Sequence, residues 1–313
     1  QALVRGAPVP AEVKDAIAGA LRRLAGGGEA PLVAVRSSAT VEDAAQTSFA
    51  GMFRTFLHVR GREGVIEAVR ACWASLFGAR ALFYRARRGV PTAEWNVAVV
   101  VQRMIDAEAS GVLFTADPAT GDPSRIVIES AWGLGETVVG GQVDVDHFEV
   151  DKETLSIVER RVGRKAFALV RAGPEGGTRR EELPREKAEA PSLDDDRIRT
   201  LAELGLRDER HYGAPQDAEF AVEGGRVWIV QTRPITTLGG APREAEAPAR
   251  REVLVRGLGA SPGSAAGTVR VLRSPAEGAK LRAGEVLVAP MTAPDWVPVM
   301  RRAAAIVTAS GGM

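Results

Sequence analysis

The chain has 313 residues, 45% of them hydrophobic and 26% charged, and these ordinary values predict about two globular domains and exclude a chain that is disordered throughout. Its 41 Lys and Arg residues balance 40 Asp and Glu residues, and the formal net charge of +1 gives no general attraction to nucleic acid or to acidic membranes. A single cysteine, Cys72, excludes an intrachain disulfide framework, and the lack of a signal peptide or a long apolar run predicts a soluble cytoplasmic protein.

Hydrophobic periodicity predicts a mixture of helices and strands in the first half of the chain. Apolar residues recur at helical spacing over residues 10–25, and the three glycines that follow would end this helix. A longer helical pattern covers residues 62–88. Strands are expected at the short apolar or alternating runs, which are residues 32–35, 53–59, 97–101, 111–115 and 125–128.

The sequence of the second half of the chain predicts an irregular segment, a helix, a hairpin and a second unit. Residues 164–195 are polar and carry several Gly and Pro, which is typical of irregular structure, and a helix is expected near 193–211. Gly224-Gly225 separates two strand-like runs and predicts a hairpin. The predicted domains are therefore 1–238 and 253–313, joined by a linker at 239–252, in a protein of the α+β or mixed α/β class.

Common nucleotide and hydrolase motifs do not occur in the sequence. It has no G-x-x-x-x-G-K-[ST] phosphate loop and no G-x-S-x-G nucleophile motif. The run Gly133–Val138 ends in Val where a dinucleotide-binding turn needs Gly or Ala for close packing. The three histidines, at 58, 147 and 211, lie far apart in sequence, so a surface or structural role is favoured over zinc binding.

Arg36-Ser37-Ser38 follows a predicted strand and is a candidate anion site. A guanidinium offers a rigid fork of donors for phosphate oxygens, and neighbouring hydroxyl and backbone N–H groups would complete the site. The simpler interpretation is a strand-end arginine with two turn serines, and the local sequence favours it. A flexible turn at Ser48–Gly51 could close over phosphates, although turns that contain glycine are common.

The hairpin carries paired polar residues that suit a magnesium ion and a phosphate. Asp217 and Glu219 share one face of their strand, and Gln231 and Arg233 share a face of the returning strand. Carboxylate and amide oxygens suit Mg²⁺, and arginine would neutralise phosphate, but a solvated charged hairpin explains the pattern equally well. A two-residue turn would place Glu219 opposite Val230, so the metal interpretation predicts a three-residue loop at 224–226.

Five motifs in order resemble the ATP-grasp domain of the phosphoenolpyruvate-utilising enzymes, and the resemblance covers residues 30–238. They are Val35–Asp43 with Ser48–Gly51, Val101–Met104, Ser130–Glu136, Asp217–Phe220 and Val230–Pro234. The runs Gly257–Gly267, Met291–Trp296 and Ala305–Thr308 resemble the first part of the swivelling phosphohistidine domain, a β/β/α unit. The short linker between the two units is similar to that of the phosphoenolpyruvate synthases, also called pyruvate, water dikinases.

This resemblance implies an ATP-dependent phosphotransferase. Pyruvate, ATP and water would give phosphoenolpyruvate, AMP and phosphate through a phosphohistidine, with Mg²⁺ as cofactor and Glu219 and Gln231 as its ligands. The family's roles imply that Arg36 and Arg233 hold phosphate and that Gln102 lies near the adenosine. The residues that would contact ATP are Arg36, Gly51, Thr55, Gln102, Glu219, Gln231 and Arg233.

Several family features have no counterpart in this sequence. The first ATP-grasp segment with its Gly-Gly-Lys, the catalytic histidine and the pyruvate-binding barrel do not occur between Gln1 and Met313. We therefore expect this fragment to be inactive by itself and pyruvate to bind to a segment outside it. Any homo-oligomer would also form through segments outside it. Two alternatives stay open, which are a related dikinase-type phosphotransferase with another acceptor, such as pyruvate phosphate dikinase or a rifampicin phosphotransferase, and a non-catalytic nucleotide-binding protein.

Overall fold

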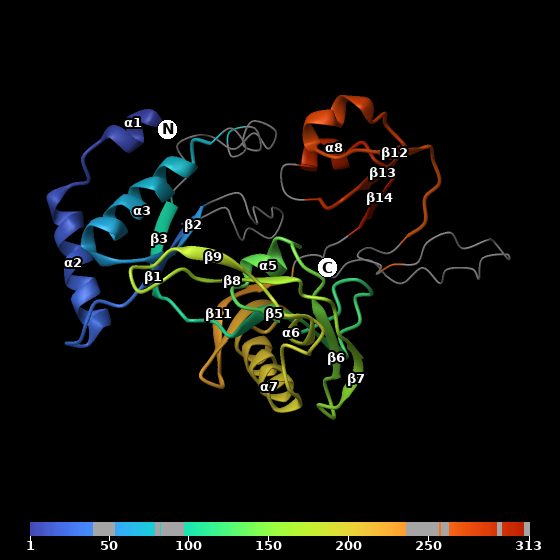
Figure 1. The fold of residues 1–313 in the computed structure, drawn as a ribbon, viewed down its shortest axis with the longest axis horizontal. Coiled ribbons are helices and arrows are strands. Elements are labelled where there is room, and N and C mark those ends of the chain that lie inside the picture. The colour runs from blue at the N-terminus through green and yellow to red at the C-terminus, as the bar shows by residue number, and fades with distance from the viewer. Residues whose placement is uncertain are drawn as a thin grey trace. The chain divides into compact units, whose positions relative to one another are not determined.

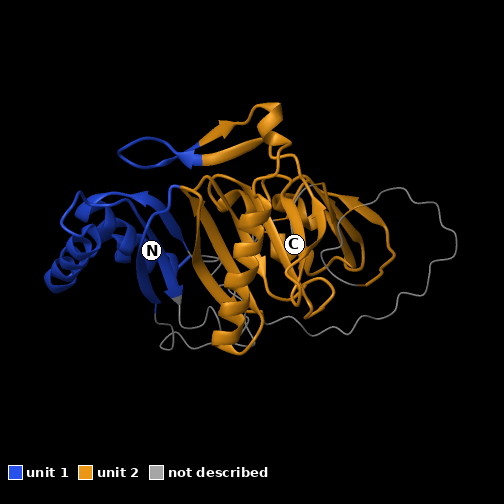
Figure 2. Ribbon diagram, turned by 90° about the horizontal axis from the view of Figure 1, so that it is seen from below, with its two compact units in different colours: residues 1–106, 170–179 blue, residues 107–169, 180–313 orange. Residues whose placement is uncertain are grey.

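A computed structural model describes residues 1–39, 54–78, 82, 97–235, 257, 263–292 and 296–309. The chain divides into two compact units, and Figure 2 distinguishes them by colour. The first unit comprises residues 1–106 and 170–179, and the second comprises residues 107–169 and 180–313. Each unit is described by itself below, with the element labels of Figure 1.

The first unit packs helices against one face of a small antiparallel sheet, whose strand order is β2-β1-β3. Its elements are α1 (Ala2–Gly6), α2 (Ala11–Ala25), β1 (Val33–Ala39), β2 (Thr55–Val59), α3 (Gly61–Ser75) and β3 (Val97–Arg103). The helix expected at 62–88 is shorter within the described residues, because α3 ends at Ser75 and turn residues follow it to Gly78. Residues 79–81 and 83–88 lie outside the described part of the chain.

Alternation along β1 explains which face of this sheet is covered. Val33 and Val35 are fully buried and form a core with Val65, Val69 and Cys72 of α3. Strand residues alternate between the two faces, so Ala34 and Arg36 lie on the opposite face. The thiol of Cys72 lies 3.5 Å from the carbonyl oxygen of Arg54, and burial raises its pKa to about 11. Cys72 is therefore a core residue and not a reactive thiol.

The second unit contains an antiparallel six-stranded sheet with the order β11-β10-β4-β5-β6-β7. Its strands are β4 (Ala109–Phe114), β5 (Arg125–Trp132), β6 (Asp146–Asp151), β7 (Ile157–Arg161), β10 (Gln216–Glu223) and β11 (Arg226–Pro234). The amphipathic helix α7 (Asp195–Tyr212) begins at Asp194, whose side chain accepts a hydrogen bond from the backbone N–H of Arg197 at 2.8 Å. This helix confirms the one expected near 193–211.

One face of the six-stranded sheet packs against α7. Leu113, Phe148 and Phe220 are buried there against Ile198 and Leu201 of the helix. Gly205 permits close packing of the helix, because a Cβ at this position would lie 2.7 Å from Cδ2 of Leu113. The apolar residues Phe148 and Phe220 alternate with polar ones along β6 and β10, so His147, Glu149, Asp217 and Glu219 lie on the face away from α7.

The segment 164–195, expected to be irregular, contains regular structure. It holds the two-stranded sheet of β8 (Phe167–Arg171) and β9 (Thr178–Glu182), followed by α6 (Arg185–Ala188). A short helix, α5 (Glu136–Val139), precedes it. Phe167 of β8 is buried with Val112 and Ala131 of the large sheet, and this burial explains a strand that composition alone did not indicate.

The C-terminal segment forms a small parallel sheet with its own core. The strands β12 (Val269–Val271), β13 (Val286–Ala289) and β14 (Ala305–Thr308) pair in this order, and the connections contain η2 (Pro275–Lys280) and α8 (Val297–Met300). Leu272, Leu281, Leu287 and Trp296 are buried together. The valines of β12 and β13 suit these short parallel strands, whose connections contain helical turns.

Glu285, which precedes β13, gives a pH prediction for this segment. Hydrogen bonds from the Arg270 guanidinium and from the Arg282 backbone N–H lower its pKa to about 2, from an ordinary value of 4.5. The stability that these contacts contribute is present above pH 4.5 and is lost as the pH falls toward 2. We expect the Glu285 carboxyl to titrate near pH 2 when followed by NMR. In the Arg270→Gln variant its pKa should rise toward 4.5, and an unchanged pKa would contradict this assignment.

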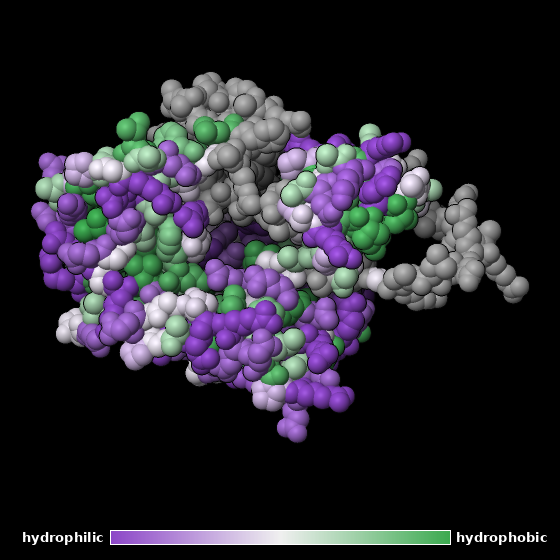
Figure 3. Space-filling model, turned by 45° about the horizontal axis from the view of Figure 1, so that its top comes forward, coloured by the Kyte–Doolittle hydropathy of each residue, from purple (hydrophilic) through white to green (hydrophobic). Residues whose placement is uncertain are grey.

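None of the described helices combines the length and the apolar character needed to cross a lipid bilayer. Hydrophilic residues cover much of the described surface seen in Figure 3, with smaller apolar areas between them. Isolated exposed apolar side chains such as Val139 and Val158 are normal for a folded domain and need no partner.

Candidate functional site

The β10–β11 hairpin brings Glu219 and Gln231 opposite each other across the two strands. Its turn has two residues, because Glu223 pairs with Arg226, and Gly224 and Gly225 have φ values of 57° and 75°, which suit such a turn. The three-residue loop predicted above is therefore wrong. A β-bulge restores the pairing instead, because Phe220 pairs with Ile229 and Val230 is the extra residue of β11.

Asp217 and Arg233 form a second cross-strand pair beside the first. Nε of Arg233 donates to Oδ2 of Asp217 at 2.8 Å, and its Nη2 lies 2.6 Å from the same oxygen. The Arg233 side chain is 32% exposed and the Asp217 side chain 15%. The carboxylate thus orients the guanidinium, whose planar set of donors suits the oxygen atoms of an anion.

Cross-strand pairing extends these two pairs into two rows that cross the sheet on one face, polar toward both edges and apolar in the middle, where Val112 and Phe114 pack with Phe167. We call this surface the polar face. Its first row is Gln231, Glu219, Val112, Glu129, His147 and Arg161. Its second row is Arg233, Asp217, Phe114, Val127, Glu149 and Glu159. Because α7 packs on the other face, all of these charged groups share the face that the helix leaves uncovered.

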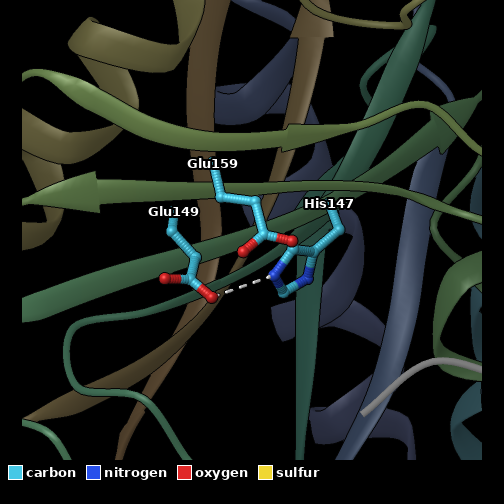
Figure 4. A group of neighbouring side chains, drawn as sticks. All are labelled: His147, Glu149 and Glu159. Carbon is cyan, nitrogen blue, oxygen red and sulfur yellow. Dashed lines mark ion pairs between the residues drawn. The ribbon is translucent and has the colours of Figure 1, made fainter. Parts of the chain in front are cut away.

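Glu129 and His147 belong to the polar face, although the sequence analysis did not assign them to a site. The Glu129 side chain is 1% exposed, and its Oε1 lies 3.6 Å from Nδ1 of His147. Nε2 of His147 lies 3.5 Å from Oε1 of Glu149 (Figure 4). Burial opposes protonation of this imidazole and Arg161 adds to that effect, but the two carboxylates outweigh them and raise the pKa above its usual value of 6.5.

A buried ion pair fixes the start of β6 next to this face. Asp146 and Lys165 are both 0% exposed and form a hydrogen-bonded ion pair. Oδ1 of Asp146 also accepts from the backbone N–H of Gly163 at 3.0 Å, and Oδ2 accepts from the N–H and hydroxyl of Ser192 at 2.6 and 2.7 Å. Nζ of Lys165 donates to the carbonyl of Gly163 at 2.8 Å. Every charge is partnered, as burial requires.

In the first unit, Arg36, Thr55 and Gln102 lie on one face of the small sheet. Arg36 pairs with Thr55 of β2, and Ala34, on the same face as Arg36, pairs with Gln102 of β3. This is the face opposite the α3 core. Gly51, the remaining candidate, lies outside the described residues.

The position of Arg36 corrects one expectation. It lies within β1 rather than after it, and its strand neighbours belong to both ladders of the sheet. The hydroxyl of Ser37 donates to the carbonyl of Arg54 at 3.2 Å and so lies on the core side. Ser37 therefore does not share a face with Arg36, whereas Ser38, two residues along the strand, does. The anion site at Arg36 stays a prediction.

The polar face of the hairpin has the composition of a magnesium–phosphate site. Glu219 offers a carboxylate and Gln231 an amide oxygen, both of which are hard ligands that suit Mg²⁺. Arg233, two residues beyond Gln231 on the same face, offers a cation next to that position. The chemistry of such a set suits the binding and neutralisation of an anionic group, and none of these side chains is a nucleophile.

Two family models match this chain. The model described as "Pyruvate phosphate dikinase, AMP/ATP-binding domain" matches residues 1–253, which is more than half of the chain. The model described as "PEP-utilising enzyme, mobile domain" matches residues 281–313. The first match covers the candidate residues of both units, and the second covers β13, α8 and β14.

Proteins named as phosphoenolpyruvate synthases or probable phosphoenolpyruvate synthases are similar to nearly all of this chain. A probable phosphoenolpyruvate synthase of Methanothermobacter thermautotrophicus is 50% identical over 281 residues, which is 90% of this chain and 40% of that protein. One of Archaeoglobus fulgidus is 47% identical over 91% of this chain and 38% of its own length. The phosphoenolpyruvate synthase of Pyrococcus furiosus is 44% identical over 99% of this chain and 39% of its own length. The chain thus spans about two fifths of these relatives.

Proposed function

Since this chain belongs to the family of the pyruvate phosphate dikinase AMP/ATP-binding domain, we propose that it supplies the ATP-binding part of a phosphoenolpyruvate synthase. The complete enzyme would convert pyruvate, ATP and water into phosphoenolpyruvate, AMP and phosphate through a phosphohistidine. Relatives that carry the name phosphoenolpyruvate synthase support this proposal. The proposed fold is an ATP-grasp domain over residues 1–238, a linker at 239–252 and the first part of a swivelling domain from residue 253.

The pairing of Glu219 with Gln231 is the observation that carries the proposal. Both residues lie on the polar face beside the Asp217–Arg233 pair. Phosphoryl transfer from ATP consists largely of positioning and charge neutralisation, and this set of groups can provide both. The strand that carries Asp217 and Glu219 is held in the middle of the sheet, because β10 is hydrogen-bonded to β11 on one side and to β4 on the other.

The residues present fit a magnesium ion. Glu219 and Gln231 would hold it, and bound Mg²⁺ would neutralise charge on the transferring phosphoryl group. Arg233 would bind a phosphate oxygen with its guanidinium, which Asp217 orients. In the first unit, Arg36 and Thr55 would contact the phosphates and Gln102 the nucleoside. By the family resemblance, Gly51 would belong to a turn that covers the phosphates.

An assay of the complete enzyme tests the function directly. The full-length protein is incubated with ATP, pyruvate and Mg²⁺, and AMP and phosphoenolpyruvate are quantified. We expect AMP formation that requires pyruvate and equals the phosphoenolpyruvate produced. The 313-residue chain alone should form no phosphoenolpyruvate, because none of its histidines lies in the C-terminal segment. AMP without dependence on pyruvate would instead favour a dikinase-type enzyme with another acceptor.

Arg36 should be sensitive even to a conservative change. Arg36→Lys retains the charge but loses the bidentate fork, so we expect the Kd for ATP in the full-length protein to rise roughly tenfold. Isothermal titration calorimetry measures this constant. Arg103→Lys is the matched control, because Arg103 is exposed and pairs with Val33, on the face opposite to Arg36. Equal ATP affinity in both variants would show that Arg36 does not bind ATP and has a structural role.

A further inference from the structure

His147, Glu149 and Glu159 form a cluster on the outer strands of the large sheet, away from the hairpin. One potential ligand atom from each residue lies within 4.8 Å of the other two. In Figure 4 the three side chains point toward one another, with Glu159 coming from β7 and the other two from β6. Nε2 of His147 is 3.5 Å from Oε1 of Glu149. An imidazole and two carboxylates are ligands that Zn²⁺ accepts in proteins.

Glu149 and Glu159 lie directly opposite each other on neighbouring antiparallel strands. Like charges at such positions destabilise a strand pair. On β7, Arg160 forms an ion pair with Asp195 and lies over the ring of Phe148, so its side chain is on the α7 face. Arg161 lies on the face of the glutamates, but opposite His147 rather than between Glu149 and Glu159. A cation bound between the two glutamates would remove this repulsion.

His147 supplies a second, independent observation. Its side chain is 4% exposed, and Nδ1 has no hydrogen-bond partner within the usual distance among the described residues. That nitrogen instead faces the buried Glu129 carboxylate at 3.6 Å. A carboxylate on Nδ1 selects the tautomer that leaves the Nε2 lone pair available for a metal, and metal-bound histidines commonly have such a partner.

We propose that His147, Glu149 and Glu159 bind a zinc-class divalent transition-metal ion, with Glu129 orienting the imidazole. Glu149 is 27% exposed and Glu159 lies on the surface, so water can complete the coordination. A nitrogen ligand distinguishes this site from the all-oxygen pair Glu219 and Gln231, which suits Mg²⁺. Arg161, opposite His147 on β7, faces the same area and weakens cation binding without blocking it. The sequence disfavoured zinc only because its histidines are far apart, and this site needs one histidine.

Zinc titration of the chelator-stripped 313-residue chain tests the proposal. We expect calorimetry with Zn²⁺ alone to show a site whose affinity falls at least about tenfold in Glu159→Gln. Glu159 is exposed, so this variant should fold normally. The control is Glu153→Gln, which removes the same charge from an exposed position in the β6–β7 turn and should leave the affinity unchanged.

Two further readouts make the assignment decisive. Saturating Zn²⁺ should raise the thermal unfolding midpoint of the wild type and of Glu153→Gln, and it should raise that of Glu159→Gln less. X-ray absorption of the zinc-loaded chain should show one imidazole nitrogen at about 2.0–2.1 Å and oxygen ligands otherwise. Equal zinc affinity in wild type and Glu159→Gln overturns the proposal, as does binding that disappears only when the exposed His211 is replaced by Gln.

Discussion

Glu219→Gln should lower kcat/KM for ATP in the full-length enzyme by roughly 100-fold or more, because it replaces the charged ligand of the proposed magnesium site. The substitution keeps the size of the side chain and its place opposite Gln231. It removes the negative charge that would hold Mg²⁺ against the phosphates. Steady-state kinetics at several Mg²⁺ concentrations measure the effect, and a higher Mg²⁺ concentration should restore part of the activity.

Glu223→Gln is the matched control for this experiment. Glu223 lies on the same strand and the same face, but it is at the hairpin turn, opposite Arg226. We expect its kinetics and magnesium dependence to stay within about threefold of the wild type, as surface substitutions usually have small effects. If Glu219→Gln behaves like this control, the hairpin does not bind the metal, and the polar face needs another explanation.

Lys165→Met should destabilise the second unit by about 3–5 kcal/mol, which is the usual cost of removing one partner from a buried ion pair. Lys165 and Asp146 are completely buried, so the variant leaves the Asp146 carboxylate without its counter-ion and away from water. Hydrogen bonds from Gly163 and Ser192 remain, but they do not replace the lost charge. Urea unfolding followed by tryptophan fluorescence measures the change.

Lys187→Met gives the comparison for that measurement. Lys187 is exposed, and its ammonium lies 5.1 Å from the ring centre of Trp132 in the same unit. Such a cation–π contact at the surface contributes about 0.5–1 kcal/mol, so we expect only a small loss of stability. Similar effects at positions 165 and 187 would show that the buried pair is not important for folding.

Much of the fold could be predicted from the sequence where hydrophobic patterns are long and regular. The helix α7 and the strands β1, β3, β4, β5, β10 and β11 lie close to the expected residues. The helix has a buried face at helical spacing, whereas β4 and β5 are buried almost continuously and were indicated by their apolar runs. The strands β6 to β9 were missed. His147 and Glu149 do alternate with Phe148 and Val150, which is typical of a half-buried strand, whereas β8 and β9 are short and lie in a polar segment.

The candidate site could be predicted only in part, because residues meet there across strands. The spacing of polar residues showed which residues share a face within each strand. It did not show which residues of the two strands lie opposite each other, because that register depends on a bulge that the alternation of apolar and polar residues does not reveal. Glu129 became a neighbour of His147 only through the pairing of β5 with β6. The burial of Lys165 is equally hidden, because lysine is normally a surface residue and its partner Asp146 lies 19 residues away.

The bulge at Val230 has a consequence for how the gene can change. Without Val230, a regular ladder from the same turn would still place Ile229 opposite Phe220 and Gln231 opposite Glu219. Loss of that single codon would therefore preserve every partner in the hairpin. Loss of the Trp228 codon would instead move Ile229 opposite Ala221 and Val230 opposite Phe220 in a regular ladder. Natural variation in strand length should be tolerated at Val230 and avoided at Val227 and Trp228.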